Sequence, residues 1–154
     1  MSSRRDLIVT DIITALNTAS GKPAGLNVHR QRSLPIGRDI LPSMVVYIIE
    51  EENRTGPGMG ARPIPQRKSI RTMIVRVETR INAGTTPPDQ ALDQYLTWMV
   101  QKIAADPQRS TMADDTLELK TEWASSAEED AVYAATQTDW SVKYITESAD
   151  PTTA

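Results

Sequence analysis

The sequence predicts an α+β fold, in which two helices pack on a mainly antiparallel, twisted sheet of four to five strands. Two segments place apolar residues three and four positions apart, as helices do, and four or five others alternate apolar and polar residues, as strands do. Their order is helix, short strand, two long strands, helix and two strands. The chain of 154 residues has room for one two-layer domain, which we place at residues 1–147.

Both predicted helices have recognisable ends. The first, residues 4–19, carries an apolar stripe and is followed by a glycine and a proline, which stop a helix. The second, residues 87–103, has one continuous apolar stripe and is followed by an Asp-Pro pair. We expect the Thr86 side chain to cap its first turn.

Five segments are predicted to be strands, because they are rich in β-branched, aromatic or alternating residues. In chain order they are residues 26–30, 44–50, 68–81, 117–123 and 132–144. The segment 44–50 is apolar on both faces, so we expect an inner strand covered on both sides. In the segment 117–123, Leu117, Leu119 and Trp123 occupy alternate positions, which predicts a half-exposed strand.

Three segments are predicted to lack regular structure: residues 53–67, 125–130 and 148–154. The first is rich in glycine and proline, and it is long enough to be flexible and to reach a neighbouring molecule. Four basic residues in or next to it are our candidate interface residues: Arg54, Arg62, Arg67 and Lys68. Their charge suits nucleic acid or an acidic protein surface.

Charge is distributed unevenly along the chain. Residues 1–85 contain 13 basic and 7 acidic residues, a net charge of +6, whereas residues 86–154 contain 4 and 13, a net charge of −9. Two interpretations stay open. The halves neutralise each other inside one molecule, or the basic side of one subunit meets the acidic side of the next in a head-to-tail contact that closes into a ring.

The sequence gives little indication of catalysis, a metal or a cofactor, and we predict none of them. Cysteine is absent, so no thiol can act as a nucleophile or metal ligand. His29 is the only histidine, so only one imidazole could act as a general base. The acidic runs 50–52 and 114–115 could bind a divalent cation, but such runs are more often solvated. The glycine-rich stretch 56–61 lacks the Gly-Lys-Ser/Thr ending of a phosphate-binding loop.

The N-terminal residues are charged instead of forming an apolar run, so we expect no signal peptide. No apolar run approaches the ~20 residues of a membrane span, so we also expect no membrane contact. The protein is therefore expected to fold in the cytoplasm of the cell that makes it.

This pattern resembles the tail terminator and minor tail (tail-completion) proteins of long-tailed bacteriophages. The shared features are the helix that begins at Arg4, the strand pair 44–50 and 68–81 around a glycine- and proline-rich loop, the helix 87–103, and a closing strand that ends Trp-Ser-Val-Lys-Tyr at Tyr144. The resemblance lies in element order and length and covers nearly the whole chain.

The resemblance implies a small α+β protein without catalytic residues that forms a hexameric ring, caps the tail tube and joins it to the neck of the head. Its partners would be copies of itself, the tail tube protein and a head-tail connector or neck protein, with DNA passing through the lumen. It would be part of the virion tail and be assembled in the host cytoplasm. The alternatives are another connector or stopper component, a small nucleic-acid-associated module and, with least support, an enzyme.

Overall fold

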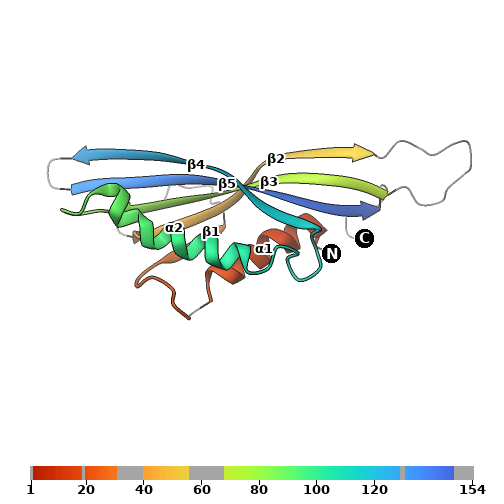
Figure 1. Ribbon diagram of the computed structural model, residues 1–154, viewed down its shortest axis with the longest axis horizontal. Helices are drawn as coiled ribbons and strands as arrows, with labels where there is room; N and C mark the ends of the chain where they lie inside the picture. Colours follow the sequence, from red (N-terminus) through yellow and green to blue (C-terminus); the bar gives the residue numbers. More distant parts are fainter. Residues whose placement is uncertain (1, 19, 31–39, 56–67, 129–130, 148–154) are drawn as a thin grey trace, which may run out of the picture.

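The computed structural model describes residues 2–18, 20–30, 40–55, 68–128 and 131–147. Within them the chain forms α1 (Arg4–Leu16), β1 (Asn27–Arg30), β2 (Ser43–Thr55), β3 (Lys68–Asn82), α2 (Pro88–Ala104), β4 (Asp115–Glu128) and β5 (Ala131–Glu147). Figure 1 shows one strongly twisted sheet with both helices on the same side of it. We call the sheet face toward the helices the inner face and the opposite one the outer face.

The sheet has the strand order β1-β2-β3-β5-β4. The pairs β2–β3, β3–β5 and β5–β4 are antiparallel, whereas β1 runs parallel to β2. The predicted α+β class with two helices is therefore confirmed. The sheet, predicted to be mainly antiparallel, is mixed, with three antiparallel pairs and one parallel pair. A strand of four residues carries no sequence signal for its direction, because direction depends on the path of the chain on either side of it.

The inner face holds the hydrophobic core. Alternate residues of β3, namely Met73, Val75 and Val77, are fully buried, which confirms that residues 68–81 form a strand with one apolar face. The helices supply the facing layer with Ile8, Val9, Ile12 and Leu16 from α1 and Leu92, Met99 and Ile103 from α2. Since each such side chain contributes about 1.5–3 kcal/mol on burial, this layer is the main source of stability.

The two helices begin differently. Ser3 caps α1, because its Oγ accepts a hydrogen bond from the Asp6 amide at 3.2 Å. The prediction that Thr86 caps α2 is wrong, since Pro87 occupies the cap position and no side chain bonds to the first turn. Proline serves there because its fixed φ directs the chain into the helix. Neither described helix has the length and apolarity needed to cross a membrane.

Two strands are longer than predicted. β2 continues to Thr55, which pairs with Ser69, so residues 53–55 belong to the sheet and not to the loop predicted at 53–67. β4 continues to Glu128, which pairs with Ala131, so most of the turn predicted at 125–130 is strand. In both cases pairing with a long neighbouring strand outweighs weak local propensity. The predicted tail, 148–154, lies outside the described residues.

The connection from α2 to β4 is fixed to α1. Three consecutive residues in it have positive φ, namely Arg109 (46°), Ser110 (55°) and Thr111 (72°). Such a run persists only where surrounding contacts hold it. The contacts come from Arg4, whose guanidinium donates to the carbonyls of Met112 at 2.7 Å and Thr111 at 3.0 Å, and from the fully buried Arg109 side chain, which lies 3.4 Å from Asp11. The start of β4 is therefore set by the helix layer.

The helix layer predicts a contrast within α1. Ile12→Ala, at a fully buried position, is expected to lower the free energy of unfolding by about 2–5 kcal/mol, because it removes apolar contacts and leaves a cavity. Leu7→Ala, on the exposed side of the same helix, is expected to change it by less than about 0.5 kcal/mol. Urea unfolding followed by circular dichroism measures both, and equal effects would contradict the layer arrangement.

Candidate interaction surface

No helix of the described chain covers the outer face of the sheet (Figure 1). The prediction that the segment 44–50 is covered on both sides is therefore wrong for its outer side. Ile49, the extra residue of a β-bulge between Ile48 and Glu50, is 41% exposed. The solvent-exposed face of a sheet normally carries polar residues. Large apolar side chains grouped on that face are therefore unusual and call for an explanation.

Large exposed apolar side chains gather on the sheet. Among the described residues they are Leu7, Ile49, Ile70, Leu117, Leu119 and Trp123, of which five lie on β2, β3 and β4. Ile70 lies directly opposite Ile145, and Ile74 and Leu117 both pair with Ser141 from either side of β5. Directly paired residues share a face, so Ile70, Ile74, Leu117 and Ile145 all lie on the outer face, with Thr72 and Lys143 between the two ends of the group. We call these four residues the outer apolar patch. Grouped exposed apolar residues are typical of interaction sites.

β4 differs most from its prediction. A half-exposed strand would bury Leu117, Leu119 and Trp123, but these side chains are 57%, 55% and 53% exposed. A β-bulge between Glu118 and Lys120 shifts the alternation, so that Leu117 lies on the outer face while Trp123, which pairs with the buried Thr136, lies on the inner face. β4 therefore presents large apolar side chains on both faces of the sheet.

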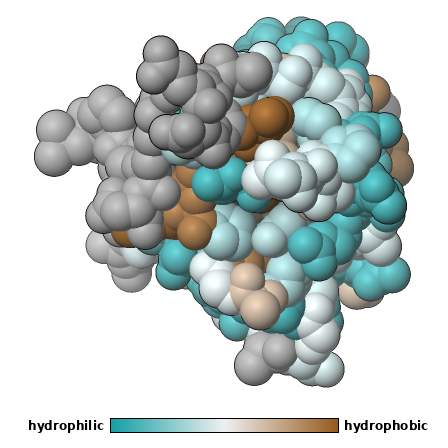
Figure 2. Space-filling view, turned by 90° about the vertical axis from the view of Figure 1, so that its left-hand side faces the viewer, coloured by the Kyte–Doolittle hydropathy of each residue, from teal (hydrophilic) through white to brown (hydrophobic). Residues whose placement is uncertain are grey.

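β4 is also an edge strand, with no strand of the described chain on its second side. It is the last strand of the sheet and is 14 residues long, whereas β1 at the opposite edge has 4. Figure 2 views the end at which β4 leads into β5, where hydrophilic and near-neutral residues cover most of the surface and apolar areas are small. A free edge exposes unpaired backbone N–H and C=O groups, so it is a ready template for another strand.

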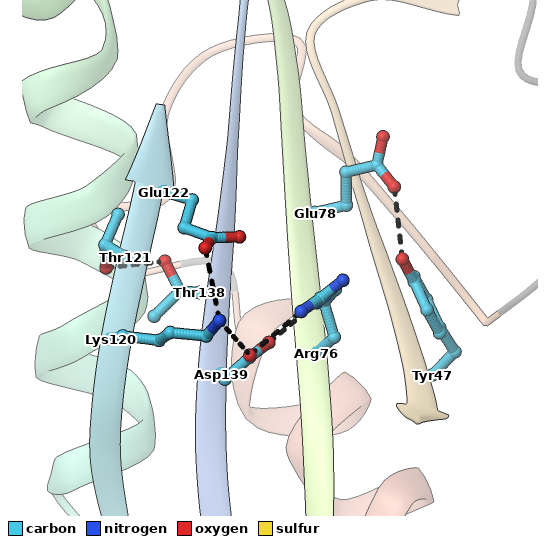
Figure 3. A network of polar contacts seen from close by, with 8 residues as sticks. All are labelled: Tyr47, Arg76, Glu78, Lys120, Thr121, Glu122, Thr138 and Asp139. Atoms are coloured by element: carbon cyan, nitrogen blue, oxygen red, sulfur yellow. Dashed lines mark hydrogen bonds and ion pairs between the residues drawn. The ribbon is translucent and has the colours of Figure 1, made fainter. Parts of the chain in front are cut away.

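A row of charged side chains crosses the outer face beside the patch (Figure 3). The Arg76 guanidinium on β3 donates two hydrogen bonds to the carboxylate of Asp139 on β5, from Nε to Oδ1 at 2.7 Å and from a terminal nitrogen to Oδ2 at 2.9 Å. Lys120 on β4 lies 3.8 Å from the same carboxylate and 3.1 Å from Glu122. The row therefore joins three strands through side chains as well as through the backbone.

These contacts change the acid–base properties of the row. The hydrogen bonds from Arg76 lower the pKa of Asp139 below its ordinary value and outweigh its burial. Further along, the Tyr47 hydroxyl donates to Glu78 at 3.4 Å, and burial together with this carboxylate raises the pKa of Tyr47. Asp139 is thus an ionised, buried carboxylate on a face that no helix covers.

A second polar cluster lies on the inner face, where the helix layer ends. The Glu51 carboxylate accepts hydrogen bonds from Arg5 on α1 at 2.8 Å, from Arg71 on β3 at 2.7 Å and from the Tyr144 hydroxyl at 3.0 Å. Burial opposes ionisation of Glu51, but these donors outweigh it and lower its pKa. The bulge in β2 turns Glu51 toward the inner face. The sequence of the acidic run 50–52 did not show that Glu51, unlike its two neighbours, is part of the folded interior.

The candidate residues of the basic loop are only partly placed. Arg54 and Lys68 stand at the ends of β2 and β3, both are exposed, and Arg54 pairs in register with Ile70 of the outer apolar patch. Arg54 also forms an ion pair with Glu52 at 3.1 Å. Arg62 and Arg67 lie outside the described residues. The two placed residues therefore border the patch.

The possible cation sites gain no support from the described part of the chain. No group of three or more His, Asp or Glu side chains there is arranged to hold a metal ion. Glu51 is engaged by two arginines, and His29 lies in β1 opposite Val45.

The charge asymmetry is only partly resolved inside the molecule. Among the described residues, two ion pairs join the halves of the chain, Arg76–Asp139 and Arg109–Asp11. The other arginine pairs, such as Arg30–Asp6 at 2.6 Å, stay within the first half. Only Arg76–Asp139 joins a base of the first half to an acid of the second, so among the described residues internal neutralisation is limited to this pair, and exposed acids of α2 such as Asp93 face solvent.

Asp139→Asn tests the contribution of the charged row to stability. It is expected to lower the free energy of unfolding by about 2 kcal/mol at neutral pH, because the Arg76 guanidinium loses its carboxylate partner. Since the folded-state pKa of Asp139 is lowered, this contribution exists above the unfolded-state pKa of about 3.9 and is lost as the pH falls through the folded-state value.

Urea unfolding of both proteins from neutral pH to below about pH 4 measures this, and the two stabilities should converge on acidification. Asp93→Asn, on the exposed side of α2, is the matched control and should change stability by less than about 0.5 kcal/mol. A constant difference between Asp139→Asn and the unchanged protein at every pH would contradict the assignment.

No protein-family model matches this chain, and no curated protein sequence is significantly similar to it. The outer face and the edge of β4 are therefore the features from which a function can be inferred.

Proposed function

We propose that this protein is a structural subunit of the tail of a long-tailed bacteriophage, a tail terminator that forms a hexameric ring at the head-proximal end. In this role it caps the tail tube and joins it to the neck, and its partners are copies of itself, the tail tube protein and a neck protein. DNA passes through the lumen of the ring without being read. The virion tail is its final location, after assembly in the host cytoplasm.

One observation supports an assembly role above all. The helices cover one face of the sheet, and five of the six large exposed apolar side chains of the described chain lie on the strands. A protein that works alone gains nothing from this arrangement, because exposed apolar groups favour association. A subunit that becomes buried in an assembly needs such side chains as anchors.

The charges fit head-to-tail contact between copies. The acids of the second half, such as Asp89 and Asp93 on α2, are exposed, while Arg54 and Lys68 stand at the other end of the sheet. A contact between these two sides joins different surfaces, so repetition of it closes a ring when the rotation allows. Charge then directs encounter and register, while the apolar anchors supply most of the affinity.

The mass of the purified protein tests the ring. Static light scattering at low salt is expected to give about six times the monomer mass of 17.0 kDa, and at high salt a smaller average mass, because salt screens contacts between charged surfaces. Imaging of the large species should show closed rings. A monomer that stays monomeric when purified tail tubes are added would contradict the proposal. A preference for a portal-side adaptor over tail tubes would favour a connector or stopper.

The four basic candidates provide a second test. Changing Arg54, Arg62, Arg67 and Lys68 together to Ser is expected to weaken ring formation and to reduce its dependence on salt, because the basic side of the contact is lost. The control for a general change of charge removes two positive charges elsewhere, by Lys22→Ser, next to the end of α1, and Lys102→Ser, in the last turn of α2. Assembly with unchanged salt dependence in the fourfold variant would rule out this loop as the basic side.

A further inference from the structure

The free edge of β4 is suited to pairing in its second half. The β-bulge at Glu118 and Lys120 interrupts the regular ladder, and the strand is regular from Lys120 onward. Bulges and lysines are devices that discourage edge-to-edge association, and here both stand at one end of this regular stretch. Beyond them follow Thr121, Glu122, Trp123, Ala124 and Ser125, without a proline or another basic residue.

The described chain contains few strands that could pair with this edge. β3 and β5 have neighbours on both sides, whereas β2 pairs with β1 only over residues 43–46, so its residues 47–55 also lack a described neighbour on one side. β1 itself has only 4 residues. β4 itself is the one long strand whose second side is wholly open among the described elements. Among the described strands, β4 of a second copy therefore offers the longest open side for pairing with β4.

Geometry limits how two copies of β4 can pair. In an antiparallel pair of identical strands that continue one sheet, directly opposed residues lie on the same face. One residue must therefore stand opposite its own copy, and we name the two-fold axis after that residue. The axis must also lie well beyond the bulge, because an axis at Thr121 would leave only three regular residues in the pair. An axis at Glu122 would set two carboxylates against each other, which is unfavourable.

The axis at Trp123 has the best complementarity. It places the two Trp123 side chains opposite each other, and Thr121 then faces Ser125 while Glu122 faces Ala124. No like charges are opposed, and an aromatic pair directly across two strands is a favourable contact. An axis at Ala124 also avoids like charges, but it sets each Trp123 against a serine and leaves the largest exposed side chain of the strand without an apolar partner.

We propose that two copies of this chain associate through β4, in an antiparallel pair whose two-fold axis passes through Trp123. The contact joins two five-stranded sheets into one continuous sheet and covers the two most exposed aromatic side chains. Only about seven residues of each copy pair, which is a small interface, so the dimer is weak and dissociates on dilution.

This dimer goes beyond the proposed function and does not depend on it. A two-fold contact uses the same surface on both copies, whereas the contacts of a ring use two different surfaces. The dimer is therefore a separate form of the protein with a separate mass, and either form can be found without the other.

Sedimentation velocity at high salt, where the contacts between charged ring surfaces are screened, tests the proposal on the full chain over a range of concentrations. The unchanged protein should pass from monomer to dimer, and Trp123→Glu should weaken the dimer about tenfold or more, because it opposes two carboxylates at the axis. Leu7→Ser is the matched control, since Leu7 is also an exposed apolar side chain but lies on α1 and not on β4, and it should leave the dimer unchanged. Circular dichroism checks that each variant folds.

Ala124→Lys tests the register without removing an apolar residue. With the axis at Trp123, the new amine faces Glu122 of the other copy twice, so the dimer should become tighter. With the axis at residue 124 the two amines would oppose each other and the dimer would weaken, which would overturn the proposed register. A protein that is monomeric at every concentration, or a dimer that Trp123→Glu does not affect, would overturn the proposal as a whole.

Discussion

The whole structure depends on the burial of one face of the sheet by two amphipathic helices. Each helix offers a single apolar stripe, and the two stripes together match the apolar residues on the inner face, from Met73 on β3 to Val142 on β5. Nothing comparable remains for the outer face. Within the described residues there is therefore one core and one sheet surface that no helix covers, and we look for the function on the side that the core does not use.

An uncovered sheet face has to stay in register without a packed layer above it. Here the charged row around Arg76 and Asp139 contributes to this, because a two-pronged hydrogen bond between neighbouring strands is specific in direction and distance. The apolar side chains of the same face lie beside the row, at Ile70 and Leu117 for example.

Much of the fold could be predicted from the sequence, because the spacing of apolar residues and the local composition indicate the helices and strands. Both helices, the order of all elements and the buried stripe of β3 follow from hydrophobic spacing alone. The errors share one cause, since they fall where pairing with a distant strand decides the outcome. The extension of β2 to Thr55 and of β4 to Glu128 depends on β3 and β5, which no local pattern contains.

The interaction surface was less accessible to sequence reasoning. The spacing of Leu117, Leu119 and Trp123 predicted one apolar face, and only the β-bulge reveals that they point to different sides and stay exposed. The importance of Glu51 also depends on a bulge, the one in β2. The one signal that could have indicated the surface was the number of large apolar residues in β4, which is high for an edge strand.

The central claim is that this protein makes its apolar contacts with partners through the helix-free side of its sheet and the edge of β4. Hydrogen–deuterium exchange of backbone amides tests this most directly, with the dilute monomer compared with the largest assembly that the protein forms. The account predicts that exchange slows on assembly in β4 and in the strands of the outer apolar patch, while α1 changes little. Slowing confined to α1 and α2, with β4 exchanging as fast as in the monomer, would contradict it.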